Sequence, residues 1–224
     1  MPKAATNLAA YIRDKTLELL QEKEPEEIST RDIAKACGVT ATSLYYYYRD
    51  REAIFTGVKL YCIEEMDRFI SGQVVKRTVK QRRSGKPADL WGEVRAGFEA
   101  FRDWAFSNPR TAILVMGRFK ADTGDDPGKM EKYYRSTLFA KGLLDRLVEA
   151  GLSDSRDTLR DACLCIAALW GAIESVLLNR TIPRFWTRRG GLEFTNSMID
   201  LLTSSLAHTR SKRYGKENSI GNKK

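Results

Sequence analysis

Residues 29–55 read STRDIAKACGVTATSLYYYYRDREAIF, and this stretch decides the fold. Ser29 stands directly before a segment of helical apolar spacing, and Asp32 follows it three residues later. That spacing is typical of a capping box at the start of a helix. Gly38 comes after Cys37, at the position where helices commonly end in a left-handed residue. The pattern therefore predicts a short helix from about Ser29 to Cys37.

A second helix start follows within a few residues. Thr40 has the character of an N-cap, and Val39 is placed to pack against Leu44 as a hydrophobic staple. These signals predict another short helix over about residues 41–48. Two short helices joined by a turn around a glycine are typical of a helix-turn-helix, in which the second helix enters the DNA major groove. Corners of this kind also occur in other helical proteins, so the turn alone leaves the function open.

The outward face of the second helix favours DNA binding. At about 100° per residue, Leu44 and Tyr48 turn inward together, while Thr42 and Tyr46 point directly away from them. Tyr45 flanks this outward face. Tyrosine hydroxyls can donate hydrogen bonds to phosphates or base edges, and the rings can contact thymine methyl groups.

Taken together, residues 29–55 resemble the N-terminal DNA-binding signature of TetR-family transcriptional regulators. That signature has a helix, Gly-Val-Ser/Thr, three variable residues, Leu-Tyr-x-His-Phe, two further residues, and Lys-Glu before an apolar residue. The resemblance spans about residues 8–60. Tyr47 and Tyr48 depart from the His and Phe of the signature, which adds a hydroxyl that the inward Tyr48 must satisfy.

The resemblance implies a set of DNA contacts on this chain. Phosphate contacts would come from the start of the first short helix and from Tyr47, which stands at the family's histidine. Arg51 occupies the family's lysine position at the start of the next helix, where a cation beside exposed backbone N–H groups completes a phosphate clamp. The implied DNA-binding residues are Thr30, Arg31, Thr40, Ala41, Thr42, Ser43, Tyr45, Tyr46, Tyr47 and Arg51.

Outside this stretch, apolar residues recur at helical spacing and strand-like alternation is missing, so the sequence predicts an all-α protein. A long helix should begin after Asp50. Between residues 76 and 86 the periodicity fails and charge accumulates, and we expect a domain boundary or a mobile connection there. Later helices are expected at about 129–150, 154–180 and 191–209, after a loop at residues 122–128.

The predicted organisation has two helical domains and a tail. Residues 1–55 should form a three-helix helix-turn-helix domain that includes the start of the connecting fourth helix. Residues 56–209 should form a larger helical domain that, by the resemblance, binds an effector and dimerises. The basic tail at residues 210–224 has almost no apolar content and is expected to be disordered.

The two last long helices, at about 154–180 and 191–209, suit a dimer interface. Residues 161–178 are apolar on more than one face, and such a helix must be buried on more than one side. A four-helix bundle built from both helices of two subunits would bury it, as would the centre of a monomeric domain. A symmetric dimer also gives one short recognition helix two half-sites to bind.

The resemblance further implies a ligand pocket among the helices of the larger domain. Aromatic residues crowd these helices, and tryptophan or tyrosine can line a pocket with one polar atom each. Core packing explains aromatic stripes at helical spacing equally well. The candidate lining residues are Phe98, Phe101, Trp104, Phe119, Tyr133, Tyr134 and Trp170.

Composition excludes several classes of protein. The chain has a net charge of +9, but residues 1–60 carry equal numbers of bases and acids, so the excess positive charge lies in 76–86 and 210–224. With the single histidine His208, no metal-ligand spacing and no phosphate-binding glycine loop, we expect no enzyme activity, no cofactor and no metal. Four cysteines without a signal peptide indicate reduced thiols, and no stretch is apolar enough to span a membrane.

The sequence thus predicts a cytoplasmic, homodimeric, ligand-responsive repressor that binds a palindromic operator in double-stranded DNA. Its effector would be an unidentified small molecule. The alternative is a helical module that binds a small molecule or a protein without operator recognition. The electrical neutrality of residues 1–60 keeps that alternative open.

Overall fold

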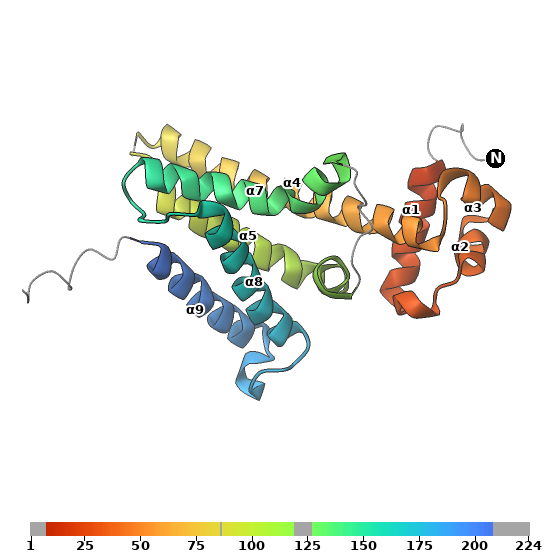
Figure 1. Ribbon diagram of the computed structural model, residues 1–224. Coiled ribbons are helices and arrows are strands. Elements are labelled where there is room, and N and C mark those ends of the chain that lie inside the picture. Colours follow the sequence, from red (N-terminus) through yellow and green to blue (C-terminus); the bar gives the residue numbers. More distant parts are fainter. Residues whose placement is uncertain (1–7, 86, 119–126, 208–224) are drawn as a thin grey trace, which may run out of the picture.

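The computed structural model describes residues 8–85, 87–118 and 127–207, and all regular structure in these ranges is helical (Figure 1). The all-α prediction is confirmed. None of the helices in these ranges is both long and apolar enough to cross a lipid bilayer. The elements are α1 Leu8–Glu22, η1 Pro25–Glu27, α2 Thr30–Cys37, α3 Ala41–Tyr47, α4 Arg51–Arg83, α5 Leu90–Ser107, α6 Pro109–Ile113, the π-helical turn η2 Leu114–Arg118, α7 Pro127–Glu149, α8 Thr158–Leu177, η3 Pro183–Phe185 and α9 Arg188–Leu206.

Helices α1, α2 and α3 form a small unit at one end of the molecule, which we call the headpiece (Figure 1). The helix starts and ends that the sequence predicts here are present in the structure. The Ser29 hydroxyl accepts a hydrogen bond from the Asp32 backbone N–H, and the Asp32 carboxylate accepts one from the Ser29 N–H at 2.8 Å. Gly38 ends α2 with a φ of 65°, a left-handed conformation that costs glycine little.

The start of α3 is capped by Thr40, and the start of α4 by Asp50, whose carboxylate accepts from the Ala53 N–H at 2.8 Å. Helix α3 ends at Tyr47, one residue earlier than predicted. Tyr48 leaves the helix in extended backbone conformation and keeps its ring turned inward, as the predicted angle of this residue required.

Helix α4 joins the headpiece to the rest of the molecule and is 33 residues long. At 1.5 Å per residue it spans about 50 Å. Its first turns bury Ile54 and Val58 against the headpiece, where it packs on α1. Further along, Ile63, Met66 and Ile70 face a body made of α5 to α9 (Figure 1).

The prediction of a break between residues 76 and 86 is wrong, because α4 continues as helix to Arg83. Contacts across the chain hold this segment on the body. Arg77 forms an ion pair at 2.8 Å with Asp89, the N-cap of α5, and the Thr78 hydroxyl donates to Glu93 at 2.9 Å. The bases near its end also interact favourably with the negative end of the helix dipole. A turn follows at Gly85.

The body helices α7, α8 and α9 correspond to the predicted segments 129–150, 154–180 and 191–209 within a few residues. Helix α8 starts later than predicted because Asp157 caps it, accepting from the Arg160 N–H at 3.0 Å. Helices α8 and α9 pack against each other and lie together at one side of the body (Figure 1). Most of the predicted 122–128 loop and the tail at residues 210–224 lie outside the described residues.

Candidate DNA-binding surface and ligand pocket

Helix α3 presents two of its tyrosines, Tyr45 and Tyr46, to solvent. Leu44 is fully buried, while Tyr46 is 84% exposed and Tyr45 and Thr42 are exposed beside it. This is the inward and outward division that the helical angle predicts. The two exposed rings lie next to each other and give α3 an aromatic outer face.

The surface extends to the start of α2 and to the turn before α3. Arg31 is exposed in the first turn of α2, and Thr30 beside it is half-buried. The Thr40 hydroxyl accepts from the Ser43 N–H at 3.2 Å, and the two side-chain hydroxyls are hydrogen-bonded at 2.9 Å. Ala41, with its small half-buried side chain, lets a partner approach the helix start closely.

Tyr47 is half-buried and packs against the headpiece core. Its ring meets the Tyr46 ring edge to face, with centroids 5.1 Å apart. This contact restricts how Tyr46 can orient at the surface. Tyr47 therefore contacts the core and also lies at the edge of the exposed face of α3. The resemblance implies that it binds phosphate there.

Tyr48 finds the hydrogen-bond partner that its inward hydroxyl needs. The hydroxyl donates to the Ala9 carbonyl on α1 at 3.0 Å, and burial raises the pKa of the Tyr48 phenol. Gly57 on α4 makes room for the ring, because a Cβ there would lie 3.2 Å from a Tyr48 ring carbon. One tyrosine thus ties the end of α3 to α1 and α4.

Arg51 has a structural role that the sequence did not indicate. Its Nε donates to the Ile28 carbonyl at 2.7 Å, and its terminal nitrogen donates to the Pro25 carbonyl. The guanidinium also lies 4.4 Å from the centre of the Phe55 ring. Arg51 therefore fastens η1 and the entry to α2 onto α4, in addition to the phosphate contact that the resemblance implies.

Sequence reasoning missed Arg49 at this surface. Its side chain is 80% exposed on the turn between α3 and α4, and it forms an ion pair with Asp50 at 2.8 Å. The available signal was position, because a base directly after the second helix of a helix-turn-helix lies beside the groove that this helix would enter.

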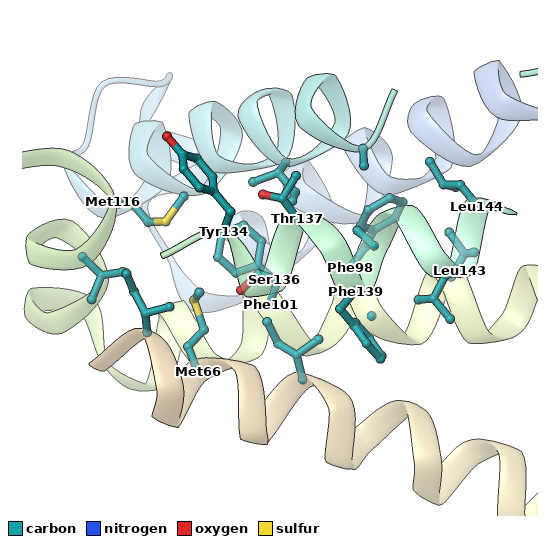
Figure 2. A pocket seen from close by; sticks show the side chains of 18 of the residues that line it. Met66, Phe98, Phe101, Met116, Tyr134, Ser136, Thr137, Phe139, Leu143 and Leu144 are labelled. Carbon is teal, nitrogen blue, oxygen red and sulfur yellow. The ribbon is translucent and has the colours of Figure 1, made fainter. Parts of the chain in front are cut away.

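A largely apolar cavity of about 220 Å³ lies inside the body, walled mainly by α4, α5, α7 and η2 (Figure 2). Four predicted lining residues take part in its wall: Phe98, Phe101, Tyr133 and Tyr134. Ser136 and Thr137 add hydroxyl groups. Within residues 8–85, 87–118 and 127–207, no three His, Cys, Asp or Glu side chains come close enough to hold a metal ion.

Two of the predicted pocket residues do not line this cavity. Trp104 is buried in the core. Trp170 lies outside the cavity wall, with its ring tilted by 37° against that of Phe101 and the ring centroids 6.5 Å apart. Helical spacing predicts that an aromatic residue lies on the inner side of a helix. It does not predict whether the ring packs against another side chain or lines a cavity. Phe119 lies outside the described residues.

Several lining residues come from elements where sequence reasoning did not look. Met66 and Ile70 extend the buried stripe of α4, and Met116 projects from η2 (Figure 2). Methionine fills irregular space well because its side chain is unbranched and flexible. Continuation of the apolar stripe of α4 past Cys62 was the signal that could have found the first two.

A hydrogen bond joins the headpiece to the body close to this cavity. The Gln21 amide at the end of α1 donates to the Thr111 hydroxyl on α6 at 3.2 Å. Helix α6 leads directly into η2, which contributes Val115 and Met116 to the cavity wall. Helix α1 is thus connected to elements of the cavity wall in two ways, through its packing on α4 and through α6.

Comparison with known proteins matches residues 12–58 to the family of bacterial regulatory proteins called the tetR family. These residues form a TetR-family N-terminal domain. The matched segment covers α2 and α3 and ends within α4, so the exposed tyrosines of α3 lie inside the match. No curated protein sequence matches the chain.

Solved structures share the TetR-type fold over nearly the whole chain. A protein of unknown function from Rhodococcus sp. RHA1 has a TM-score of 0.70 at 16% identity, covering 93% of this chain and 100% of its own. The TetR-family regulator PfmR from Thermus thermophilus has a TM-score of 0.60 at 18% identity, with 86% and 97% covered. The regulator FadR from Bacillus subtilis, solved with stearoyl-CoA, has a TM-score of 0.61 at 15% identity, with 88% and 98% covered.

Proposed function

We propose that this protein is a cytoplasmic, ligand-responsive repressor that binds a palindromic operator as a homodimer. The observation that carries the proposal is the exposed tyrosine face of α3, placed outward by a fully buried Leu44 within a TetR-family N-terminal domain. Tyr46, Tyr45 and Thr42 would contact base edges, while Arg31 and Arg49 would contact phosphates. The proposal assigns the protein no catalytic step.

Homodimerisation is supported by apolar side chains on the outer faces of α8 and α9. Leu164 is 60% exposed and Leu201 is 66% exposed, and Leu159 is exposed near the start of α8. Burying such residues against a second copy would remove apolar area from water at about 25 cal/mol per Å². A two-fold axis there would also set two α3 helices side by side for two half-sites.

The effector would occupy the cavity between α4, α5 and α7. Its apolar walls and few hydroxyl groups are typical of a small-molecule site. FadR of Bacillus subtilis, which shares this fold, was solved with stearoyl-CoA. By filling the cavity, an effector would favour one position of α4 and α6, and so change the separation of the two recognition helices.

The test is selection of the purified protein against a random duplex DNA pool, followed by affinity measurements at several salt concentrations. We expect a palindrome whose half-sites lie about 34–36 Å apart, one turn of the DNA helix. Retention of unrelated sequences with a steep salt dependence would contradict the proposal. That result would instead favour a helical binding module without operator recognition, an interpretation that the neutral charge of residues 1–60 supports.

A further inference from the structure

A buried carboxylate beside the cavity lacks part of its hydrogen bonding. Asp67 on α4 is only 9% exposed. Its Oδ1 accepts a hydrogen bond from the Ser136 hydroxyl on α7, but its Oδ2 is shielded from water and has no hydrogen-bond partner among the described residues. A carboxylate oxygen taken out of water without a donor is costly, so the atom needs an explanation.

Asp67 also borders a second cavity, of about 260 Å³, that adjoins the apolar one. The two cavities share three lining residues: Ile70, Ser136 and Phe139. Phe139 extends from α7 toward α4 in Figure 2, and Ser136 lies on the same helix. The two cavities are therefore neighbours, and a molecule that passes between these shared residues would place an apolar body in the first cavity and a polar group in the second.

The charged groups around Asp67 leave its Oδ2 unpaired. From α4, Glu64 and Arg68 line the second cavity, and Glu64 is paired at 3.0 Å with Lys132 on α7. From α7, Arg135 also lines the cavity and is exposed. Burial is the main influence on the pKa of Asp67 and raises it to about 6, although the Ser136 hydrogen bond and the field of Arg135 lower it.

We infer that the effector is a lipophilic cation, an amine or ammonium compound whose charged nitrogen lies beside the Asp67 carboxylate while its apolar body fills the cavity between Met66 and Phe101. That this ligand acts as an effector rests on the proposed function, whereas its binding to the cavity does not. A neutral ligand of the same shape, even one with a hydroxyl that can donate, would leave the negative charge of Asp67 uncompensated, and an anionic one would place a second negative charge beside it. A charge-assisted hydrogen bond of about 2.7–2.9 Å satisfies the carboxylate.

The test uses three probes with the same eight-carbon chain: n-octylamine, 1-octanol and octanoate. Binding of each to the full-length protein is measured by isothermal titration calorimetry at pH 7.5. We expect octylamine to bind at least about tenfold more tightly than octanol, and octanoate to bind most weakly. In Asp67→Asn, which keeps an acceptor for Ser136, the preference for the amine should disappear while octanol binding changes by less than about twofold.

A matched variant and a pH series separate charge from folding. Arg135→Met removes a cation beside the site, so it should strengthen octylamine binding by about threefold and leave octanol binding unchanged. Lowering the pH from 7.5 to 5 should weaken octylamine binding by about tenfold, because Asp67 becomes protonated while the amine stays charged. The inference is overturned if octanol or octanoate binds as tightly as octylamine, or if Asp67→Asn keeps the preference.

Release of the selected operator by octylamine is measured in parallel. Preference for the amine together with release supports the inference in full. Preference without release upholds the cation site and overturns its regulatory role. Operator binding without any preference among the probes overturns the inference and leaves the proposed repressor function standing.

Discussion

Four consecutive tyrosines at the end of α3 lie in different environments, and the proposed recognition surface depends on this division. Tyr45 and Tyr46 are in solvent, Tyr47 supports the Tyr46 ring, and Tyr48 is fixed to α1 by its hydroxyl. The same type of side chain thus serves as a support at Tyr47 and an anchor at Tyr48, and by the proposed function as a DNA contact at Tyr45 and Tyr46. The rings within α3 differ because the helix turns each one by about 100° relative to the one before.

The first prediction separates reading of the base sequence from phosphate binding. Tyr46→Ala should lower discrimination between operator and mismatched DNA by about 1–3 kcal/mol, because it removes contacts to base edges. Arg31→Ala should weaken binding to all DNA alike and reduce the salt slope by about one. Affinities for both variants are measured by fluorescence anisotropy on matched duplexes. Parent-like behaviour of both variants would mean that this face does not contact DNA.

The second prediction concerns the anchor. Tyr48→Phe removes the hydrogen bond to the Ala9 carbonyl and keeps the ring, so the free energy of unfolding should fall by about 1 kcal/mol. Tyr46→Phe is the matched control and should leave stability unchanged, because its ring is in solvent. Urea unfolding followed by circular dichroism measures both. Equal effects of the two substitutions would contradict the anchoring role.

The third prediction uses the titration of Asp67. Its pKa in the folded protein, about 6, lies above the ordinary value of 3.8, so the folded state holds this proton more tightly than the unfolded state. The contribution of Asp67 to stability therefore falls as pH rises between these values and stays low above them. Asp67→Asn should be roughly 3 kcal/mol more stable than the parent at pH 7.5 and about equal to it near pH 4, by urea unfolding. A pH-independent difference would refute this.

Elements with local end signals were predictable from sequence, and elements held by distant contacts were not. Ser29, Thr40 and Asp50 cap their helices through bonds within three residues, so the pattern alone located α2, α3 and the start of α4. The end of α4 was missed because it depends on bonds from Arg77 and Thr78 to α5. Those partners lie more than ten residues further along the chain, so the hydrophobic periodicity of α4 does not reveal them.

The candidate sites divide in the same way. The outward face of α3 followed from the helical angle, whereas the cavity wall required knowledge of which inward residues meet a void. Trp104 and Trp170 point inward yet meet other side chains. Asp67 did leave a signal, because it interrupts the apolar stripe of α4 between Ile63 and Ile70. A charged residue within a buried stripe marks a site that packing alone does not explain.

The fourth prediction belongs to α6. Thr111→Val keeps the shape of the side chain but removes the hydrogen bond from Gln21. Operator affinity without ligand should stay within about twofold, while ligand-induced release should weaken by about threefold, since one exposed hydrogen bond carries part of the coupling. Gln21→Leu should act alike, and the double variant should add nothing further. Additive effects on release would exclude this hydrogen bond as a coupling element.

At the scale of the whole molecule, the proposed function requires a second copy of the chain. The fifth prediction is that Leu201→Glu converts the dimer to a monomer in analytical ultracentrifugation and lowers operator affinity by about 100-fold or more, because a buried unpaired charge disfavours the interface. Leu138→Glu is the control, since this exposed leucine lies on α7, across the body from α9 (Figure 1). Dimers that persist in Leu201→Glu would place the interface elsewhere.

The length of α4 determines how far the headpiece moves when the helix tilts at the cavity. Met66 at the cavity and Arg51 at the headpiece are fifteen residues apart on one uninterrupted helix, so about 22 Å separates them. A rotation of roughly 5° about the cavity end would carry the headpiece end about 2 Å sideways, and two-fold symmetry would double that at the DNA. The helix thereby converts a small angle into a distance on the scale of a base-pair step. Stiffness along α4 should therefore matter as much to regulation as any side chain that touches the ligand.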